Sequence, residues 1–261
     1  MLSIVVPGYN EAGNIVRLVT AIREAMSVIP QPYELVYVDD ASTDESWTIL
    51  KRFGAEDTRI RALRLSRNCG QSAALWAGIR AGRGRFIATL DADLQNDPAE
   101  LPKFLAALEN FDCVCGSRQQ TRRKGDNLVR YCSSRIANWV RNKITRESVK
   151  DSACGYRVFK RECAEDLKFF KGMHRFMPTL FKIEGYTVTE IPVNHRARFS
   201  GKSHYGIWNR LFTTISDLLA VRWMQKRTIR YQIAERINPP TEPETSHKQS
   251  GSKPHSPLYE S

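Results

Sequence analysis

The sequence predicts an α/β fold with a mostly parallel sheet and flanking helices. Over the first 115 residues, short apolar runs alternate with segments of helical period. The composition is that of a globular protein, with 41% hydrophobic and 26% charged residues among 261. No apolar stretch approaches the roughly 18 residues that a membrane-spanning helix needs. Strands that alternate with helices favour right-handed βαβ crossovers, and therefore parallel neighbours.

Each element of this first half has its own local signal. The run 2–6 is continuously apolar, as a buried parallel strand requires. Segment 14–28 has apolar residues at Ile15, Leu18, Ile22 and Met26, which is a helical period. Pro98 suits the first turn of a further helix. The expected strands are 2–6, 34–38, 60–65, 86–90 and 113–115, and the expected helices are 14–28, 45–53, 71–81 and 98–108.

The second half is organised differently. Segment 128–144 predicts an amphipathic helix with an Arg-rich face, and a mixed region with a helix near 161–170 and a strand at 187–191 follows. Apolar residues recur every four positions over 207–223, which predicts a second amphipathic helix with a basic end. The polar tail is expected to be disordered. The expected domains are a catalytic domain over 1–205, an amphipathic basic helix over 206–232 and a tail over 233–261.

The chain is basic, with 40 Lys and Arg against 28 Asp and Glu and a net charge of +12. Segments 116–150 and 195–230 together carry more positive charge than the whole chain has in net, so the remainder of the chain is slightly acidic. A basic surface can face nucleic acid, anionic lipid or a phosphorylated substrate. No nucleic-acid-binding signature accompanies the charge, so we expect no nucleic-acid partner.

Acidic residues follow the strands. Asp39 and Asp40 come directly after one apolar run, and Asp91 and Asp93 follow another. Because ligands of such sheets bind at the carboxyl ends of the strands, these side chains are expected to converge there. Hard oxygen ligands suit Mg²⁺ or Mn²⁺ rather than zinc. The alternative is that Asp91 and Asp93 only cap the next turn.

Several other chemistries lack their motifs. The glycines complete neither a dinucleotide-binding G-x-G-x-x-G nor a P-loop. The five histidines form no recognisable triad or H-E-x-x-H, and no G-x-S-x-G is present. The six cysteines show no C-x-x-C, and we expect them to be buried or free thiols.

Four short motifs stand out in the first half of the chain: Val5–Glu11 (VVPGYNE), Val38–Asp44 (VDDASTD), Leu90–Gln95 (LDADLQ) and Gly116–Arg118 (GSR). Taken together, they resemble the motifs of family 2 glycosyltransferases with the GT-A fold. The later motifs are similar to those of the polyprenyl-phosphate branch, which includes dolichyl-phosphate mannosyltransferases: R-x-x-x-S-x-x-x-N from Arg130, D-x-x-x-G-Y-R from Asp151 and R-x-x-G-x-S from Arg198. The resemblance spans about residues 2–222.

The resemblance implies a role for each matching residue. The base and ribose of the donor nucleotide would be held by Pro7, Tyr9, Glu11, Val38, Asp39 and Asp40. The divalent metal and the diphosphate would be met by Asp91, Asp93 and Gln95, with Arg118 near the donor sugar or diphosphate. The phosphate of a polyprenyl acceptor would be held by Arg130, Ser134 and Arg198, and Asp93, Arg130 and Arg198 are the expected catalytic residues.

One position departs from the family pattern. The family often reads G-x-S-K, with the lysine on the donor diphosphate, whereas here His204 follows Ser203 and the lysine is Lys202. The cation that contacts the diphosphate is therefore either Lys202 or His204.

The expected reaction is an inverting, metal-dependent transfer of a hexose of the mannose or glucose type from a GDP- or UDP-sugar to a polyprenyl phosphate. A lipid phosphate is already ionised at neutral pH and needs placement more than a base, and arginine provides that placement by paired hydrogen bonds. The alternative is a saccharide acceptor, which would need a base such as Asp151. We expect a cytoplasmic protein, peripheral at the cytoplasmic face of a membrane or bound to a separate membrane-protein partner.

Overall fold

The computed structural model describes residues 1–118, 139–145, 151, 154–194, 207–229 and 235, with side chains from 215 onward in the last helix. The chain divides into two units, Met1–Thr228 and Ile229–Ser261, and all helices and strands named below belong to the first unit. The predicted helix over 128–144 is described only in part, and residues 139–145 are helical. The tail predicted to be disordered lies almost entirely outside the described residues, and the predicted domain boundaries remain predictions.

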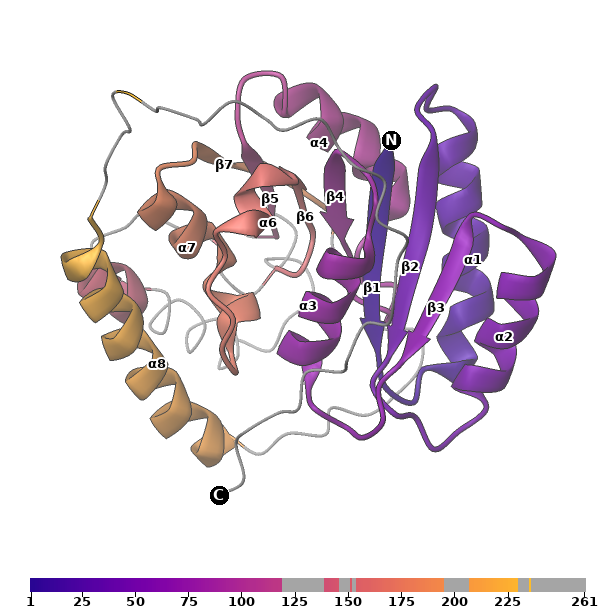
Figure 1. Cartoon of the computed structure of the whole chain (residues 1–261), viewed down its shortest axis with the longest axis horizontal. Coiled ribbons are helices and arrows are strands. Elements are labelled where there is room, and N and C mark those ends of the chain that lie inside the picture. Colours follow the sequence, from indigo (N-terminus) through magenta and orange to yellow (C-terminus); the bar gives the residue numbers. More distant parts are fainter. Residues whose placement is uncertain (119–138, 146–150, 152–153, 195–206, 230–234, 236–261) are drawn as a thin grey trace, which may run out of the picture. The chain divides into compact units, whose positions relative to one another are not determined.

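A seven-stranded, mostly parallel sheet forms the centre of this unit (Figure 1), as the sequence predicts. The strand order is β3-β2-β1-β4-β6-β5-β7, and among these described strands only β6 runs antiparallel to its neighbours. The strands are β1 (Leu2–Gly8), β2 (Tyr33–Asp39), β3 (Ile60–Arg64), β4 (Phe86–Thr89), β5 (Cys113–Ser117), β6 (Arg157–Lys160) and β7 (Val188–Pro192).

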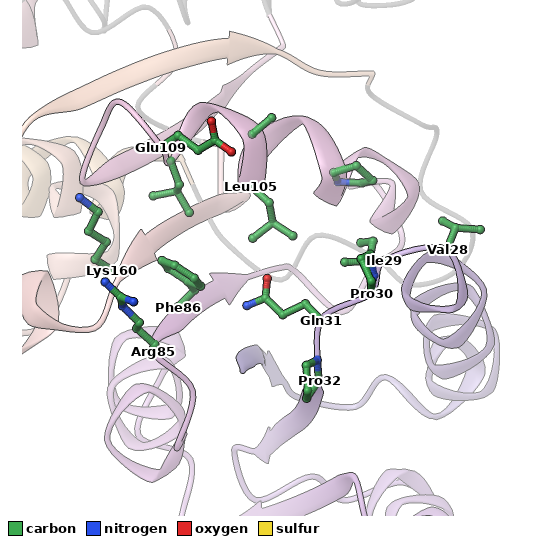
Figure 2. Close-up of a pocket in the computed structure, with 13 residues that line it drawn as sticks. Val28, Ile29, Pro30, Gln31, Pro32, Arg85, Phe86, Leu105, Glu109 and Lys160 are labelled. Atoms are coloured by element: carbon green, nitrogen blue, oxygen red, sulfur yellow. The ribbon is translucent and has the colours of Figure 1, made fainter.

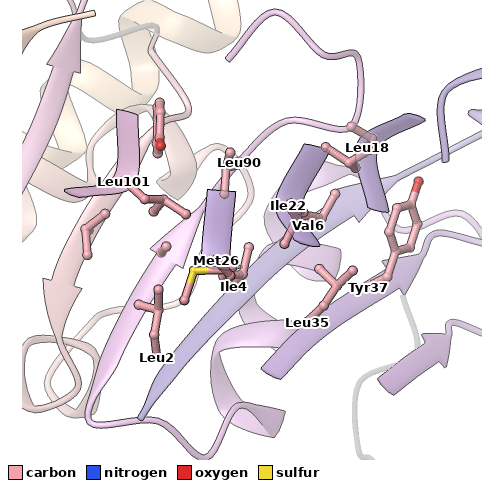
Figure 3. Packing of buried hydrophobic residues seen from close by; sticks show 14 of the residues in the cluster. Leu2, Ile4, Val6, Leu18, Ile22, Met26, Leu35, Tyr37, Leu90 and Leu101 are labelled. Atoms are coloured by element: carbon pink, nitrogen blue, oxygen red, sulfur yellow. The ribbon is translucent and has the colours of Figure 1, made fainter. Parts of the chain in front are cut away.

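Helices cover both faces of the sheet because alternate strand residues point to opposite sides. Leu2, Ile4 and Val6 of β1 pack with α1, α2 and α4 on one face, and Figure 3 shows part of this core. Val5 belongs to the core on the other face, which also contains residues of α3, α7 and α8. The helices are α1 (Ala12–Ser27), α2 (Ser46–Glu56), α3 (Gln71–Ala81), α4 (Leu101–Ala107), α6 (Glu162–Glu165), α7 (Met177–Glu184) and α8 (Ile207–Arg227), with 3₁₀ turns η1 (Pro98–Glu100) and η3 (Met173–Arg175).

The mixed region differs most from the prediction. The helix expected near 161–170 is only the four-residue α6, and β6 and α7 were not predicted from the sequence. β6 is buried between β4 and β5, and its four residues are too few to display a period of two. The final helix is present as predicted. No helix in the part of the chain described here is both long and apolar enough to cross a membrane.

Candidate active site at the carboxyl edge of the sheet

The loops after β1, β2 and β4 contain six of the predicted site residues, which are Tyr9, Glu11, Asp40, Asp91, Asp93 and Gln95. These strands are adjacent and parallel, so the three loops meet at one edge of the sheet. Each loop holds a non-glycine residue with positive φ: Asn10 at 55°, Ala41 at 59° and Leu94 at 61°. Alanine and leucine rarely adopt this conformation, and such strain concentrates at ligand-binding sites. The residues with positive φ therefore lie at the same edge of the sheet as the sequence motifs.

Side-chain hydrogen bonds fasten the first two loops to each other. Asn10 N donates to Ser42 Oγ over 2.8 Å, and Thr43 N donates to Asn10 Oδ1 over 2.8 Å. Glu11 N donates to Ser46 Oγ at 3.0 Å. The first two bonds use groups of the A-S-T-D and Y-N-E motifs, and the third uses Ser46 at the start of α2. Together they hold the segment that carries Tyr9 and Glu11 in place.

The residues predicted to hold the nucleotide differ in how far they are open to a ligand. Pro7 and Val38 are paired in the β1–β2 register and are buried, so they offer backbone and packing. Tyr9 lies beyond the end of β1 and is 39% exposed. Asp39 is fully buried and lies 3.2 Å from Arg64 Nε. Of these, Tyr9 presents the most accessible surface for a base.

Asp40 is bound to protein backbone. Its Oδ1 accepts from Cys69 N over 2.7 Å, and its Oδ2 accepts from Gly70 N over 2.8 Å. The carboxylate therefore holds the loop between β3 and α3 against the end of β2. This position indicates a structural contribution to the site that the sequence motif did not reveal.

Asp91 and Asp93 lie close enough to affect each other's ionisation. Burial raises the pKa of Asp91, the negative charge of Asp93 raises it further, and the positive charges of Arg157 and Arg118 oppose the shift. Asp91 Oδ1 accepts a hydrogen bond from Gln71 Nε2 at 3.0 Å, and Asp93 Oδ1 accepts from Gln95 N at 3.2 Å. A divalent cation would offset the repulsion between the two carboxylates.

The donor set fits Mg²⁺ or Mn²⁺. Carboxylate oxygens are hard ligands, and Mg²⁺ is commonly held by one or two carboxylates together with water and substrate phosphates. Among the described residues no group of three or more His, Cys, Asp and Glu side chains gathers to enclose a metal. Asp91 and Asp93 therefore suit an ion shared with a phosphorylated substrate better than a closed structural site.

Arg118 and Asp151 form a buried, bidentate ion pair. Arg118 Nε lies 2.7 Å and Nη2 2.9 Å from the two carboxylate oxygens, and Arg118 N also donates to Asp151 Oδ2 at 3.0 Å. Burial lowers the pKa of Arg118, but the hydrogen bonds and charge of Asp151 outweigh this and raise it. Asp151 N in turn donates to Glu190 Oε1 over 3.0 Å. Both oxygens of Asp151 are thus engaged by a cation that remains protonated.

The structure adds site residues that the sequence analysis did not assign. Gln71 begins α3 and contacts Asp91, and no motif identified it beforehand. Gly155 lies against the Asp91 carboxylate, where a Cβ atom would overlap with it. Gly155 belongs to the D-x-x-x-G-Y-R motif, so that motif contained the signal. The remaining predicted residues, Arg130, Ser134, Arg198, Lys202 and His204, lie outside the described residues, and the choice between Lys202 and His204 stays open.

A cavity of about 800 Å³ lies at the other end of the strands (Figure 2). It is lined by the segment from Val28 to Pro32, by Arg85 and Phe86 at the start of β4, and by α4. Its walls are mainly apolar. The cavity lies at the amino ends of β2 and β4, whereas ligands of parallel sheets bind at the carboxyl ends of the strands. It is therefore separate from the candidate site.

Comparison with curated proteins identifies relatives. Residues 3–168 match the pattern of Glycosyl transferase family 2. The chain is 37% identical over 230 residues to dodecaprenyl-phosphate galacturonate synthase of Rhizobium johnstonii, covering 86% of this chain and 67% of that protein. It is 35% identical over 219 residues to undecaprenyl-phosphate 4-deoxy-4-formamido-L-arabinose transferase of Yersinia enterocolitica, with coverages of 84% and 66%. The chain spans about two thirds of the length of these relatives.

Solved structures show the same fold at lower identity. Glucosyl-3-phosphoglycerate synthase from Mycobacterium tuberculosis, in complex with Mn²⁺, UDP and phosphoglyceric acid, matches with a TM-score of 0.65 at 18% identity and covers 88% of this chain and 80% of that one. Staphylococcus aureus TarS 1–349 matches with a TM-score of 0.55 at 15% identity, with coverages of 85% and 64%. These likenesses confirm the predicted GT-A fold.

Proposed function

Because this chain belongs to glycosyl transferase family 2, we propose that it transfers a sugar from a nucleoside-diphosphate sugar to a polyprenyl phosphate. The observation that carries the proposal is the Asp91–Asp93 pair at the carboxyl edge of the sheet, in a chain that is 37% identical to a dodecaprenyl-phosphate galacturonate synthase. The paired carboxylates suit the donor diphosphate only together with a cation. We take the acceptor class, a polyprenyl phosphate, from the name of this relative.

Asp91, Asp93 and Gln95 hold Mg²⁺ or Mn²⁺ in this proposal. When bound, the metal supplies positive charge beside the diphosphate that leaves from the sugar. The exposed ring of Tyr9 meets the base, and the loop fastened through Glu11 positions the ribose. Asp40 supports this part of the site by holding the β3–α3 loop.

The Arg118–Asp151 pair favours a phosphate acceptor over a saccharide acceptor. A sugar hydroxyl needs a general base, and Asp151 was the candidate. Both oxygens of Asp151 accept hydrogen bonds from Arg118, which reduces its capacity to take a proton. A lipid monophosphate needs no base and attacks directly, held by Arg130, Ser134 and Arg198. Attack opposite to the departing diphosphate inverts the anomeric centre.

The proposal leaves the transferred sugar and the nucleotide base of the donor to be identified by experiment. The expected donor is a GDP- or UDP-hexose of the mannose or glucose type, but the relatives are named for galacturonate and for 4-deoxy-4-formamido-L-arabinose. A uronic acid and a modified pentose therefore belong in the donor panel. A hydroxyl, a carboxylate or a formamido group distinguishes these sugars, and a site that forms a hydrogen bond with such a group strongly rejects donors that lack it.

A polyprenyl acceptor brings the protein to a membrane surface, and α8 suits this location. Ile215, Leu219 and Trp223 are 42%, 58% and 62% exposed and recur every four residues, and we call them the α8 stripe. Lys226 and Arg227 follow at the end of the helix. Such a helix lies at the head-group level of an anionic bilayer, with its basic residues toward the lipid phosphates.

The test is a release assay with purified protein, Mn²⁺, a polyprenyl phosphate and a panel of GDP- and UDP-sugars. We expect lipid-dependent release of one nucleoside diphosphate and a labelled product that extracts into organic solvent. Asp93→Asn should abolish release, whereas Asp97→Asn, the same change at a residue that caps η1 through Ala99 N, should retain it. Lipid-independent transfer to a saccharide, or full activity of Asp93→Asn, would overturn the proposal.

A further inference from the structure

Gln71 occupies the first position of α3, directly beside the candidate metal site. Its Nε2 donates to Asp91 Oδ1 over 3.0 Å, although the two residues are twenty positions apart in the sequence. We propose that Gln71 is a positioning residue, which orients the Asp91 carboxylate toward the divalent metal. The inference rests on the proposed function, because it assigns Asp91 to a metal.

The surroundings of Asp91 show why its orientation depends on this bond. Asn96 Nδ2 lies 3.5 Å from Asp91 Oδ2, at the limit of a hydrogen bond, so Gln71 makes the shorter contact. The backbone of Gly155 packs against the carboxylate, but glycine has no side chain that could donate a hydrogen bond to it. The terminal torsion of an aspartate has a broad energy profile, so a carboxylate without a firm donor turns easily.

Gln71 itself is held in place from both sides along the chain. The preceding residues Cys69 and Gly70 donate their backbone N–H groups to Asp40, at 2.7 and 2.8 Å. Gly70 has a φ of +85°, which permits the sharp turn into α3. The loop between β3 and α3 is therefore fixed to the end of β2, and it places Gln71 next to Asp91, which follows β4.

The residue after Gln71 is clamped to the segment before α7. Ser72 Oγ accepts a hydrogen bond from Gly172 N at 2.9 Å and lies 2.7 Å from His174 Nδ1. Ser72 is buried, so this clamp belongs to the packed interior. With Asp40 on one side and Ser72 on the other, the first turn of α3 has little freedom, and the Gln71 amide reaches Asp91 from a fixed base.

The chemistry of the amide suits this role. It donates a hydrogen bond without adding charge, whereas glutamate at this position would repel Asp91 and lysine would compete with the metal. Side chains that orient a metal ligand typically contribute 10- to 100-fold to metal affinity. We therefore expect the loss of the Gln71 donor to weaken Mn²⁺ binding by about 10- to 100-fold.

The experiment measures Mn²⁺ binding by electron paramagnetic resonance in the presence of UDP or GDP. Gln71→Met removes the donor at similar length, and the exposed position of Gln71 tolerates this change. Gln31→Met is the matched control, because Gln31 lines the cavity at the opposite end of the strands. We expect weaker Mn²⁺ binding for Gln71→Met, a value like that of the wild type for Gln31→Met, and equal thermal midpoints. Should Gln71→Met misfold, Gln71→Ala carries the same test.

The outcomes separate the inference from the proposed function. If the wild type binds Mn²⁺ with the nucleotide and Gln71→Met binds it equally well, the positioning role is wrong while the metal site stands. If the wild type itself binds no Mn²⁺ with either nucleotide, the metal-dependent function fails first. Ser72→Ala adds a graded readout, since loosening the clamp should weaken Mn²⁺ binding less than Gln71→Met does.

Discussion

Gly155 illustrates how closely the protein packs around the candidate catalytic carboxylates. Its backbone lies where any Cβ would overlap with Asp91, and its carbonyl oxygen accepts a hydrogen bond from Thr89 Oγ1 over 2.7 Å. The backbone of Gly155 is thus held against the end of β4. The close approach, rather than an unusual φ, is the reason for glycine at this position.

Gly155→Ala should therefore impair catalysis without unfolding the protein. The added methyl group pushes Asp91 aside, and a misplacement of about 1 Å costs about 100-fold in rate. The measurement is kcat in the release assay, together with the thermal midpoint. Gly54→Ala is the control, because its Cβ meets nothing closer than Ile60 O at 3.7 Å and alanine favours the helix by about 0.5–1 kcal/mol. Equal kcat values for both variants would contradict this explanation.

At the scale of elements, Asp112, the residue before β5, links β5 to β6 and β7. Its Oδ1 lies 2.7 Å from Lys160 Nζ of β6, and its Oδ2 accepts from Thr187 N and Oγ1, next to β7, at 2.9 and 2.7 Å. Burial raises the pKa of Asp112, but the bonds from Lys160 and Thr187 outweigh it and lower the pKa to about 2. The ionised carboxylate therefore stabilises the β5–β6–β7 part of the sheet.

Asp112→Asn should lower the free energy of unfolding by about 1–2 kcal/mol at pH 7. The folded pKa lies below the unfolded value of about 3.9, so the stabilisation is complete above that value and is lost as the pH falls toward 2. Urea unfolding at several pH values should show the difference between wild type and variant shrinking below about pH 4. Glu56→Gln, which removes an exposed pair with Arg52 at 3.8 Å, should change stability by less than about 0.5 kcal/mol. A constant difference from pH 7 to pH 2 would disprove the assignment.

At the scale of the whole molecule, the net charge of +12 and the α8 stripe would both favour the proposed binding to an anionic membrane surface. Positive charge would attract the protein to an anionic bilayer over a distance set by the salt concentration, and apolar side chains would then contribute about 1.5–3 kcal/mol each when buried. Neither contribution requires a helix that crosses the membrane.

Replacing Leu219 and Trp223 together by glutamine should weaken binding to vesicles with anionic lipid by at least about 10-fold. Co-sedimentation with vesicles measures this, and higher salt should reduce binding of both proteins. Val28→Gln provides the control, since Val28 is 76% exposed but lies at the end of α1. If the double variant and Val28→Gln bind like the wild type, α8 is not the membrane-binding element.

The sequence alone predicted the features that depend on neighbours along the chain. The alternation of strands and helices over 1–115 follows from periodicity, and the positions of Asp91 and Asp93 at a strand end place them at the carboxyl edge of a parallel sheet. The same local reasoning missed β6, because a strand of four residues, three of them buried, shows no period, and its partner strands β4 and β5 lie far away in the sequence.

Only the tertiary structure decided what each carboxylate binds. Asp40 meets backbone N–H groups 29 and 30 residues later, and Asp151 meets Arg118 across 33 residues. Gln71 reaches Asp91 only because α3 starts at the edge where β4 ends. A motif specifies which residue types are present, but a hydrogen bond requires two atoms within about 3 Å, and packing of the distant segments sets that distance.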